Sequence, residues 1–114
     1  MNVTTRDRDG VTVVDLEGKI TIGRGDVALR DAVNAAIDAG SRAVVLDFSK
    51  VKSMDSSGMA ELGAAYRRMD DLGGTVALCG VPSSVTEILR MTQIITVFDV
   101  YTDEDEAIAA LRSD

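Results

Sequence analysis

The sequence predicts an α/β protein: a single domain with a four-to-five-stranded, mostly parallel sheet, an antiparallel edge and four flanking helices. Three observations lead to this prediction. Strand-like and helix-like segments alternate along the chain, which is typical of parallel strands joined through right-handed helical crossovers. Residues 43–48 form a nearly continuous apolar run, as expected of a central strand buried on both faces. The length of 114 residues is that of one domain.

The first half of the chain predicts the antiparallel edge, one helix and the central strand. A short strand at 3–5 pairs as a hairpin with a β-branched strand at 11–16, across a turn at 9–10. Helical spacing of apolar residues begins after Asp26, the predicted N-cap, and stops at Gly40. The central strand at 43–48 follows. We expect Lys50 and Lys52, which come after it, to lie in a solvated loop.

The second half predicts three helices and two strands. A helix at 57–72 ends at Gly73 and Gly74, as a left-handed cap requires. A strand follows at 75–79, and Ser84 with Glu87 has the spacing of a capping box for the third helix. The last strand is predicted at 97–101, and residues 102–103 are expected to cap the final helix.

Composition excludes several classes of function. The 12 basic and 19 acidic residues give a net charge of −7, which argues against a nucleic-acid partner because phosphate backbones attract proteins of the opposite sign. The chain has no histidine, so it can form no Ser-His-Asp triad, Cys-His dyad or histidine-ligated zinc site. Cys79, the single cysteine, lies in an apolar run and is expected to be a small core residue. We therefore predict that the protein hydrolyses no ester, peptide or nucleotide and has no catalytic residue.

Targeting signals are also missing from this sequence. The polar N-terminal segment has no apolar core of a secretory signal. No apolar stretch approaches the roughly 20 residues of a membrane helix. We expect a cytoplasmic protein with no direct membrane insertion.

Residues 23–28 fit the pattern GxGxx(G/A) at the start of the first helix, and Asp47 follows Gly23 by 24 residues. This spacing is similar to a dinucleotide-binding fingerprint. However, Asp26 places a carboxylate where a pyrophosphate would approach the helix N-terminus. Two glycines before a helix are also common in ordinary turns. A nucleotide-binding domain that uses the Gly23–Ala28 loop therefore stays as the less favoured alternative.

Residues 54–59 read Met-Asp-Ser-Ser-Gly-Met between the central strand and the second helix. Sites in open α/β sheets are built at the carboxyl ends of such strands. Serine and aspartate are also ordinary N-caps, and Ser57 is the residue we expect to cap this helix. Gly58 admits a close backbone approach or satisfies local sterics, and Met59 fits either the core or an interface. From these residues alone, two interpretations of the segment stay open: a functional site and plain helix capping.

The whole layout resembles the STAS-domain family of bacterial anti-sigma factor antagonists. The resemblance covers nearly all of residues 1–114, which it implies to be one STAS domain: a Gly18-containing turn after the second strand, the buried strand, the Asp55-Ser56-Ser57-Gly58 turn and the Gly73-Gly74 stop. In that family the serine directly after the aspartate is phosphorylated, which implies Ser56 here. Many members carry a leucine-aspartate pair after the Gly18 turn, whereas this chain reads Lys19-Ile20-Thr21-Ile22.

The resemblance implies a non-enzymatic switch, that is, no enzyme activity, no metal and no cofactor. The unphosphorylated protein would bind an anti-sigma factor that is also a serine kinase, which releases the sigma factor, and a PPM-type phosphatase would reverse phosphorylation of Ser56. A STAS module of a stressosome or of a lipid-transporter complex is the alternative. We expect a monomer or weak dimer. The residues implied to contact the partner are Thr21, Ile22, Gly23, Arg24, Asp55, Ser56, Ser57, Gly58 and Met59.

Overall fold

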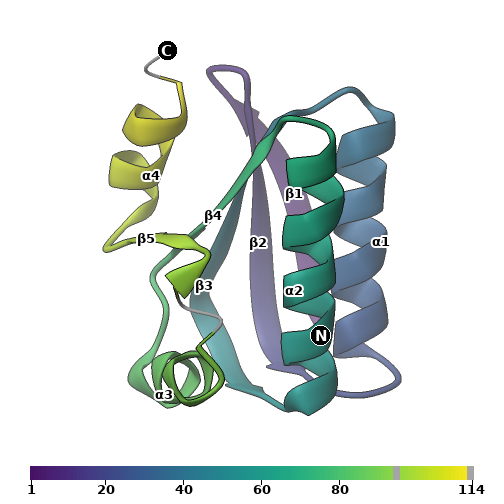
Figure 1. Ribbon diagram of the computed structural model, residues 1–114, viewed down its shortest axis with the longest axis vertical. Helices are drawn as coiled ribbons and strands as arrows, with labels where there is room; N and C mark the ends of the chain where they lie inside the picture. Colours follow the sequence, from purple (N-terminus) through teal and green to yellow (C-terminus); the bar gives the residue numbers. More distant parts are fainter. Residues whose placement is uncertain (94–95, 113–114) are drawn as a thin grey trace.

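A computed structural model describes residues 1–93 and 96–112 and confirms the predicted α/β class (Figure 1). Its five-stranded sheet has the order β1-β2-β3-β4-β5, in which β1 runs antiparallel to β2 and the other pairs are parallel. The elements are β1 (Asn2–Arg8), β2 (Val11–Ile20), α1 (Gly25–Asp38), β3 (Ala43–Met54), α2 (Ser56–Asp71), β4 (Thr75–Cys79), α3 (Ser83–Met91), β5 (Asp99–Tyr101) and α4 (Glu104–Leu111). In the described part of the chain, no helix has the length and apolar character to cross a membrane.

The larger core lies between one face of the sheet and the helices α1 and α2, which run side by side in Figure 1. The predicted apolar stripes supply it, because their residues repeat at helical spacing and meet inward-facing strand residues. Its fully buried members include Leu29 and Val33 from α1, Leu62 and Met69 from α2, and Val44, Leu46 and Phe48 from β3. This packing fixes α1 and α2 against the carboxyl ends of β2 and β3.

The central strand is longer than predicted, because β3 continues through residue 54 and does not end at 48. Its pairing register with β2 shifts twice, between Asp15 and Glu17 and between Gly18 and Lys19 of β2. Such bulges break the two-residue alternation that marks a strand in sequence. The buried residues of this part of β3 are therefore three positions apart, at Phe48, Val51 and Met54. Lys50 and Lys52 consequently lie in the strand and not in a loop. Gly18, with φ +112°, sits at the second shift and not in a turn.

The predicted N-caps of the first and third helices are wrong. The first helix begins at Gly25 with Arg24 in the N-cap position, and Asp26 lies in the first turn, where it accepts hydrogen bonds from Gly23 N–H and Val27 N–H. Ser84 and Glu87 form no capping box, since α3 begins at Ser83 with Pro82 as its N-cap, two residues before the predicted cap. Pro82 is extended, with ψ 157°, and proline readily occupies such a helix entry.

Two other helix ends are as predicted. The Asp103 side chain caps α4 by accepting a hydrogen bond from Glu106 N–H at 2.9 Å. Gly73 has φ +76°, and the N–H of Gly74 donates to the Met69 carbonyl at 2.9 Å. This is the left-handed closing pattern that glycine favours. The last strand is shorter than predicted and begins at residue 99.

A second, smaller core lies on the other face of the sheet, beneath α4. Ala107 and Ile108 of α4 pack there on Val11, Val13, Val45 and Cys79. Cys79 is fully buried, which confirms its predicted place in the core. Burial, with smaller contributions from nearby carboxylates such as Asp47, raises the pKa of the Cys79 thiol to about 12.

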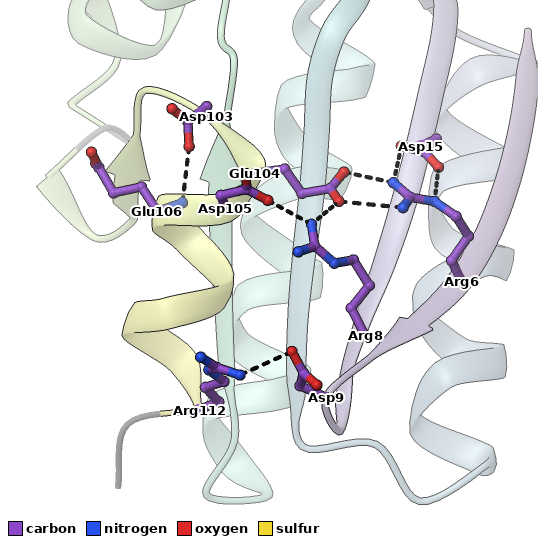
Figure 2. Close-up of polar contacts among 9 residues, drawn as sticks. All are labelled: Arg6, Arg8, Asp9, Asp15, Asp103, Glu104, Asp105, Glu106 and Arg112. Atoms are coloured by element: carbon purple, nitrogen blue, oxygen red, sulfur yellow. Dashed lines mark hydrogen bonds and ion pairs between the residues drawn. The ribbon is translucent and has the colours of Figure 1, made fainter.

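Ion pairs surround this small apolar contact and tie α4 to the first hairpin (Figure 2). The Arg6 guanidinium lies between Asp15 (2.7 Å) and Glu104, and Arg8 pairs with Glu104 and with Asp105. Hydrogen bonds from the two arginines lower the pKa of Glu104. The carboxylate oxygens of Asp15, Asp47 and Glu104 lie within 4.8 Å of one another. Arg6 therefore offsets the repulsion in this acidic group and links α4 to β2.

We predict that Glu104→Gln loosens α4 and exposes the cysteine beneath it. Arg6 and Arg8 favour the ionised form of Glu104. The contribution of Glu104 to the free energy of unfolding is therefore present at neutral pH and is lost as the pH falls below the usual glutamate range. Because these side chains are partly solvated, the free energy of unfolding should fall by about 1 kcal/mol at most. Native-state labelling of Cys79 by a thiol reagent should become up to about fivefold faster.

The matched control is Glu87→Gln, which removes the same charge from the exposed face of α3. It should leave the labelling rate at the wild-type value. Equal rates for Glu104→Gln and wild type would show that the ion pairs do not hold α4 in place.

Candidate functional site

The candidate site forms where β2 and β3 end side by side, at the lower end of the molecule in Figure 1. Ile20 pairs with Met54 at the last position of the two strands. The N–H of Asp55 then donates to the Ile20 carbonyl at 3.2 Å. Both α1 and α2 begin within a few residues of this point. The predicted position, at the carboxyl end of the central strand, is therefore confirmed.

Asp55 links two segments through its two carboxylate oxygens. Its Oδ1 accepts a hydrogen bond from Gly58 N–H and caps α2, while its Oδ2 accepts one from Ile22 N–H, each at 3.0 Å. These bonds lower the pKa of Asp55, and the bond from Gly58 N–H has the larger effect. Asp55 is thus the N-cap in place of Ser57, which lies within the first turn of α2. The bonds hold the β2–α1 loop against the start of α2.

Two glycines let the backbone of β2 approach both helices closely. A Cβ atom on Gly58 would lie 2.3 Å from the Ile20 carbonyl oxygen and 2.8 Å from the Met54 side chain. A Cβ on Gly25 would lie 2.3 Å from the Lys19 carbonyl oxygen. Real Cβ contacts are not that short, so a side chain at either position would push the helix away from β2. Gly58 therefore has the close-approach role that the sequence left open.

The side chains at the start of α2 divide between solvent and core. Ser56, the first residue of the helix, is exposed, whereas Ser57 is half-buried. Met59 is only 7% exposed and belongs to the main core, where its sulfur contacts the Thr92 hydroxyl at 2.8 Å. Of this group, Ser56 is the hydroxyl that a second protein could reach most easily.

The β2–α1 loop contributes an exposed apolar side chain beside Ser56. Ile22 is 73% exposed although Asp55 fixes its backbone. The preceding residue, Thr21, accepts a hydrogen bond from Asp26 N–H at 3.1 Å. Gly23 has φ +91°, and Arg24 is exposed. The Ile22–Asp55 bond thus joins the loop of residues 21–24 to the turn of residues 55–57, while Gly58 and Met59 are buried beneath them.

Met91, at the end of α3, is a residue that the sequence prediction missed. It is 79% exposed, and the adjacent Thr92 contacts Met59 of α2. Among the described residues, Ile22 and Met91 are the most exposed large hydrophobic side chains. Large exposed apolar side chains of this kind are candidates for contact with another protein. The sequence did contain a signal for it, because Met91 is an apolar residue that does not share the helical spacing of the buried residues Val85 and Leu89.

The geometry speaks against nucleotide binding at Gly23–Ala28. The Asp26 carboxylate occupies the N–H groups of Gly23 and Val27, which the fingerprint would direct to a phosphate. Asp47, the expected ribose ligand, stands seven residues before the end of β3 and beside Asp15 and Glu104. The parts of the fingerprint therefore do not converge on one site.

This architecture, with an Asp-Ser turn at the carboxyl end of the central strand, is that of a STAS domain. The sequence profile of the STAS domain matches residues 2–107, and the chain belongs to this family.

Known relatives resemble the chain over most of its length. An anti-sigma F factor antagonist of Paenibacillus polymyxa is 26% identical over 103 residues, which are 90% of this chain and 88% of the relative. The crystal structure of an anti-sigma factor antagonist from Mycobacterium paratuberculosis has a TM-score of 0.84 and 27% identity, covering 97% of this chain and 93% of the other. The Bacillus cell fate determinant SpoIIAA in its phosphorylated form gives a TM-score of 0.76 at 18% identity, covering 97% and 100%.

We predict that Gly58→Ala destabilises the protein because its methyl group must displace the backbone of β2. Overpacking of this kind costs about 1–3 kcal/mol. Gly63→Ala is the matched control in the same helix, since the nearest atom to its Cβ is the end of the Arg67 side chain at 3.7 Å. It should raise stability by up to about 1 kcal/mol through helix propensity. Urea unfolding of both variants measures the difference, and equal stabilities would rule out the close contact.

Proposed function

We propose that this chain is an anti-sigma factor antagonist that acts in the cytoplasm by binding and not by catalysis. In its unmodified form it binds an anti-sigma factor that is also a serine kinase, and binding releases a sigma factor for transcription. The observation that carries the proposal is the exposed Ser56 at the start of α2, next to Asp55, which holds the backbone of the loop that carries the exposed Ile22. The names of the relatives from Paenibacillus and Mycobacterium support it.

Phosphorylation of Ser56 switches this binding off. The partner kinase transfers the γ-phosphoryl group of its ATP to the Ser56 oxygen, and ADP and the hydroxyl proton leave. A PPM-type phosphatase hydrolyses the ester again and releases phosphate. The partners thus supply the nucleotide, the metal and the catalytic groups, so this chain needs none. The existence of SpoIIAA in a phosphorylated form supports this step.

The position of Ser56 explains how a phosphate can block binding without unfolding the protein. The first N–H groups of α2 and the helix dipole stabilise an anion at this end, which offsets repulsion from Asp55. At a docked interface, the same phosphate must lose its hydration or displace whatever faced the hydroxyl. A penalty of about 2.7 kcal/mol already weakens binding 100-fold.

The partner surface extends beyond Ser56 to its neighbours. It consists of the loop residues Thr21, Ile22, Gly23 and Arg24, the turn residues Asp55, Ser56 and Ser57, and Met91 at the end of α3. Ile22 and Met91 provide apolar anchors at its two sides. Gly58 and Met59, which are buried, support this surface from beneath.

We predict that Ser56, and not Ser57, is phosphorylated, and that charge at this position abolishes binding. Ser56→Asp should melt close to the wild-type temperature but bind the anti-sigma kinase at least about 100-fold more weakly. Ser56→Ala should still bind and should resist the kinase. Phosphopeptide mapping and calorimetry with the cognate kinase measure both results.

Ser57→Ala is the matched control, because it removes a hydroxyl one residue away from the acceptor. It should be phosphorylated and released like the wild type. A phosphate mapped to residue 57, tight binding by Ser56→Asp, or unfolding of that variant would each contradict the proposed switch.

A further inference from the structure

Three unpaired basic side chains surround the Ser56 end of the molecule, and we call Lys19, Arg24 and Lys52 the basic rim. All three are exposed. Lys19 pairs in register with Ser53, the neighbour of Lys52, at the ends of β2 and β3, and Arg24 stands two residues after Ile22. The ion pairs among the described residues all use other arginines. The basic rim is therefore free to meet charges on another molecule.

The acidic groups at this end are engaged within the protein. The carboxylates of Asp26 and Asp55 each accept two backbone N–H bonds, and Glu17 accepts a bond from the Asn2 amide. The helices α1 and α2 also begin here, and helix N-termini carry partial positive charge. Lys50, the remaining lysine, lies further back on β3 beside Asp15 and Asp47 and is not counted in the rim.

The basic rim contrasts with the rest of the chain. The whole sequence has 19 acidic and 12 basic residues, so an extended polyanion such as DNA or an anionic membrane would meet mostly negative surface. An acidic face on a protein could be placed close to the exposed side chains of the basic rim, and charges further than about 8 Å away are largely screened at physiological ionic strength. Ile22, 73% exposed between Lys19 and Arg24 in the sequence, supplies an apolar anchor within it.

We propose that the basic rim docks onto an acidic face of the anti-sigma partner and steers its association. This inference rests on the proposed function and adds the chemistry by which the partner is recognised. A phosphoserine at residue 56 brings about −1.5 to −2 charges into the middle of the basic rim. It thereby opposes the three positive side chains of the basic rim and adds to the negative charges of Asp26 and Asp55, which already lie at this end. Recognition and its release by phosphorylation then have one electrostatic origin.

Association kinetics with the purified kinase partner, measured at 50 and 500 mM salt, test this proposal. The rim variant is Lys19→Glu with Lys52→Glu. The control is Arg42→Glu with Arg67→Glu, which changes the total charge equally at exposed positions away from the basic rim, before β3 and in the second half of α2. Electrostatic steering changes association rates by about 10- to 1,000-fold and falls steeply with salt.

We expect the wild-type association rate to fall at least tenfold between the two salt concentrations. The rim variant should associate at least tenfold more slowly at low salt and show little further salt effect, while the control stays within about threefold of wild type. A rim variant that binds like the control would overturn this inference and leave the proposed function standing. Lysine-dependent binding of equal strength to DNA or to anionic vesicles would overturn the assignment to an acidic protein. No complex with the kinase at either salt concentration would overturn the proposed function and this inference together.

Discussion

The two hydrogen bonds of the Asp55 carboxylate hold together the segments that form the Ser56 end of the molecule. One oxygen begins α2 at Gly58, and the other fixes the β2–α1 loop at Ile22. Both bonds require β2 to pass within van der Waals distance of the helix, which the missing side chain of Gly58 permits. An exposed serine next to such a fixed carboxylate has little conformational freedom to lose on docking.

The residues that pack the core and the exposed residues around Ser56 are largely different side chains. The main core beneath α1 and α2 and the ion-paired α4 hold the fold together. The surface around Ser56 contains exposed apolar and basic side chains that contribute little to that packing. Charge can therefore be added at Ser56 with small effect on the core.

The sequence predicted the fold class and the position of the site, because helical and strand periodicity and the Asp55-Ser56 turn are local signals. It missed the far half of β3, where bulges hide the alternation, and it misplaced the cap of α2. Asp55 and Ser57 can both cap a helix, and the choice depends on where β2 ends, which is a tertiary fact. The pairing of Arg6 with Glu104 joins residues 98 positions apart and has no signal in the sequence.

The most direct test of the account is an NMR pH titration of the amide resonances of Ile22 and Gly58. Both N–H groups bond the Asp55 carboxylate, whose pKa is lowered by these bonds. Protonation must therefore weaken both bonds together, and only below the usual aspartate range. We predict that the two resonances shift with one common midpoint below about 3.8 and that neither moves in Asp55→Asn. Separate midpoints, or a common midpoint at or above the ordinary aspartate value, would show that Asp55 does not join the loop to the helix.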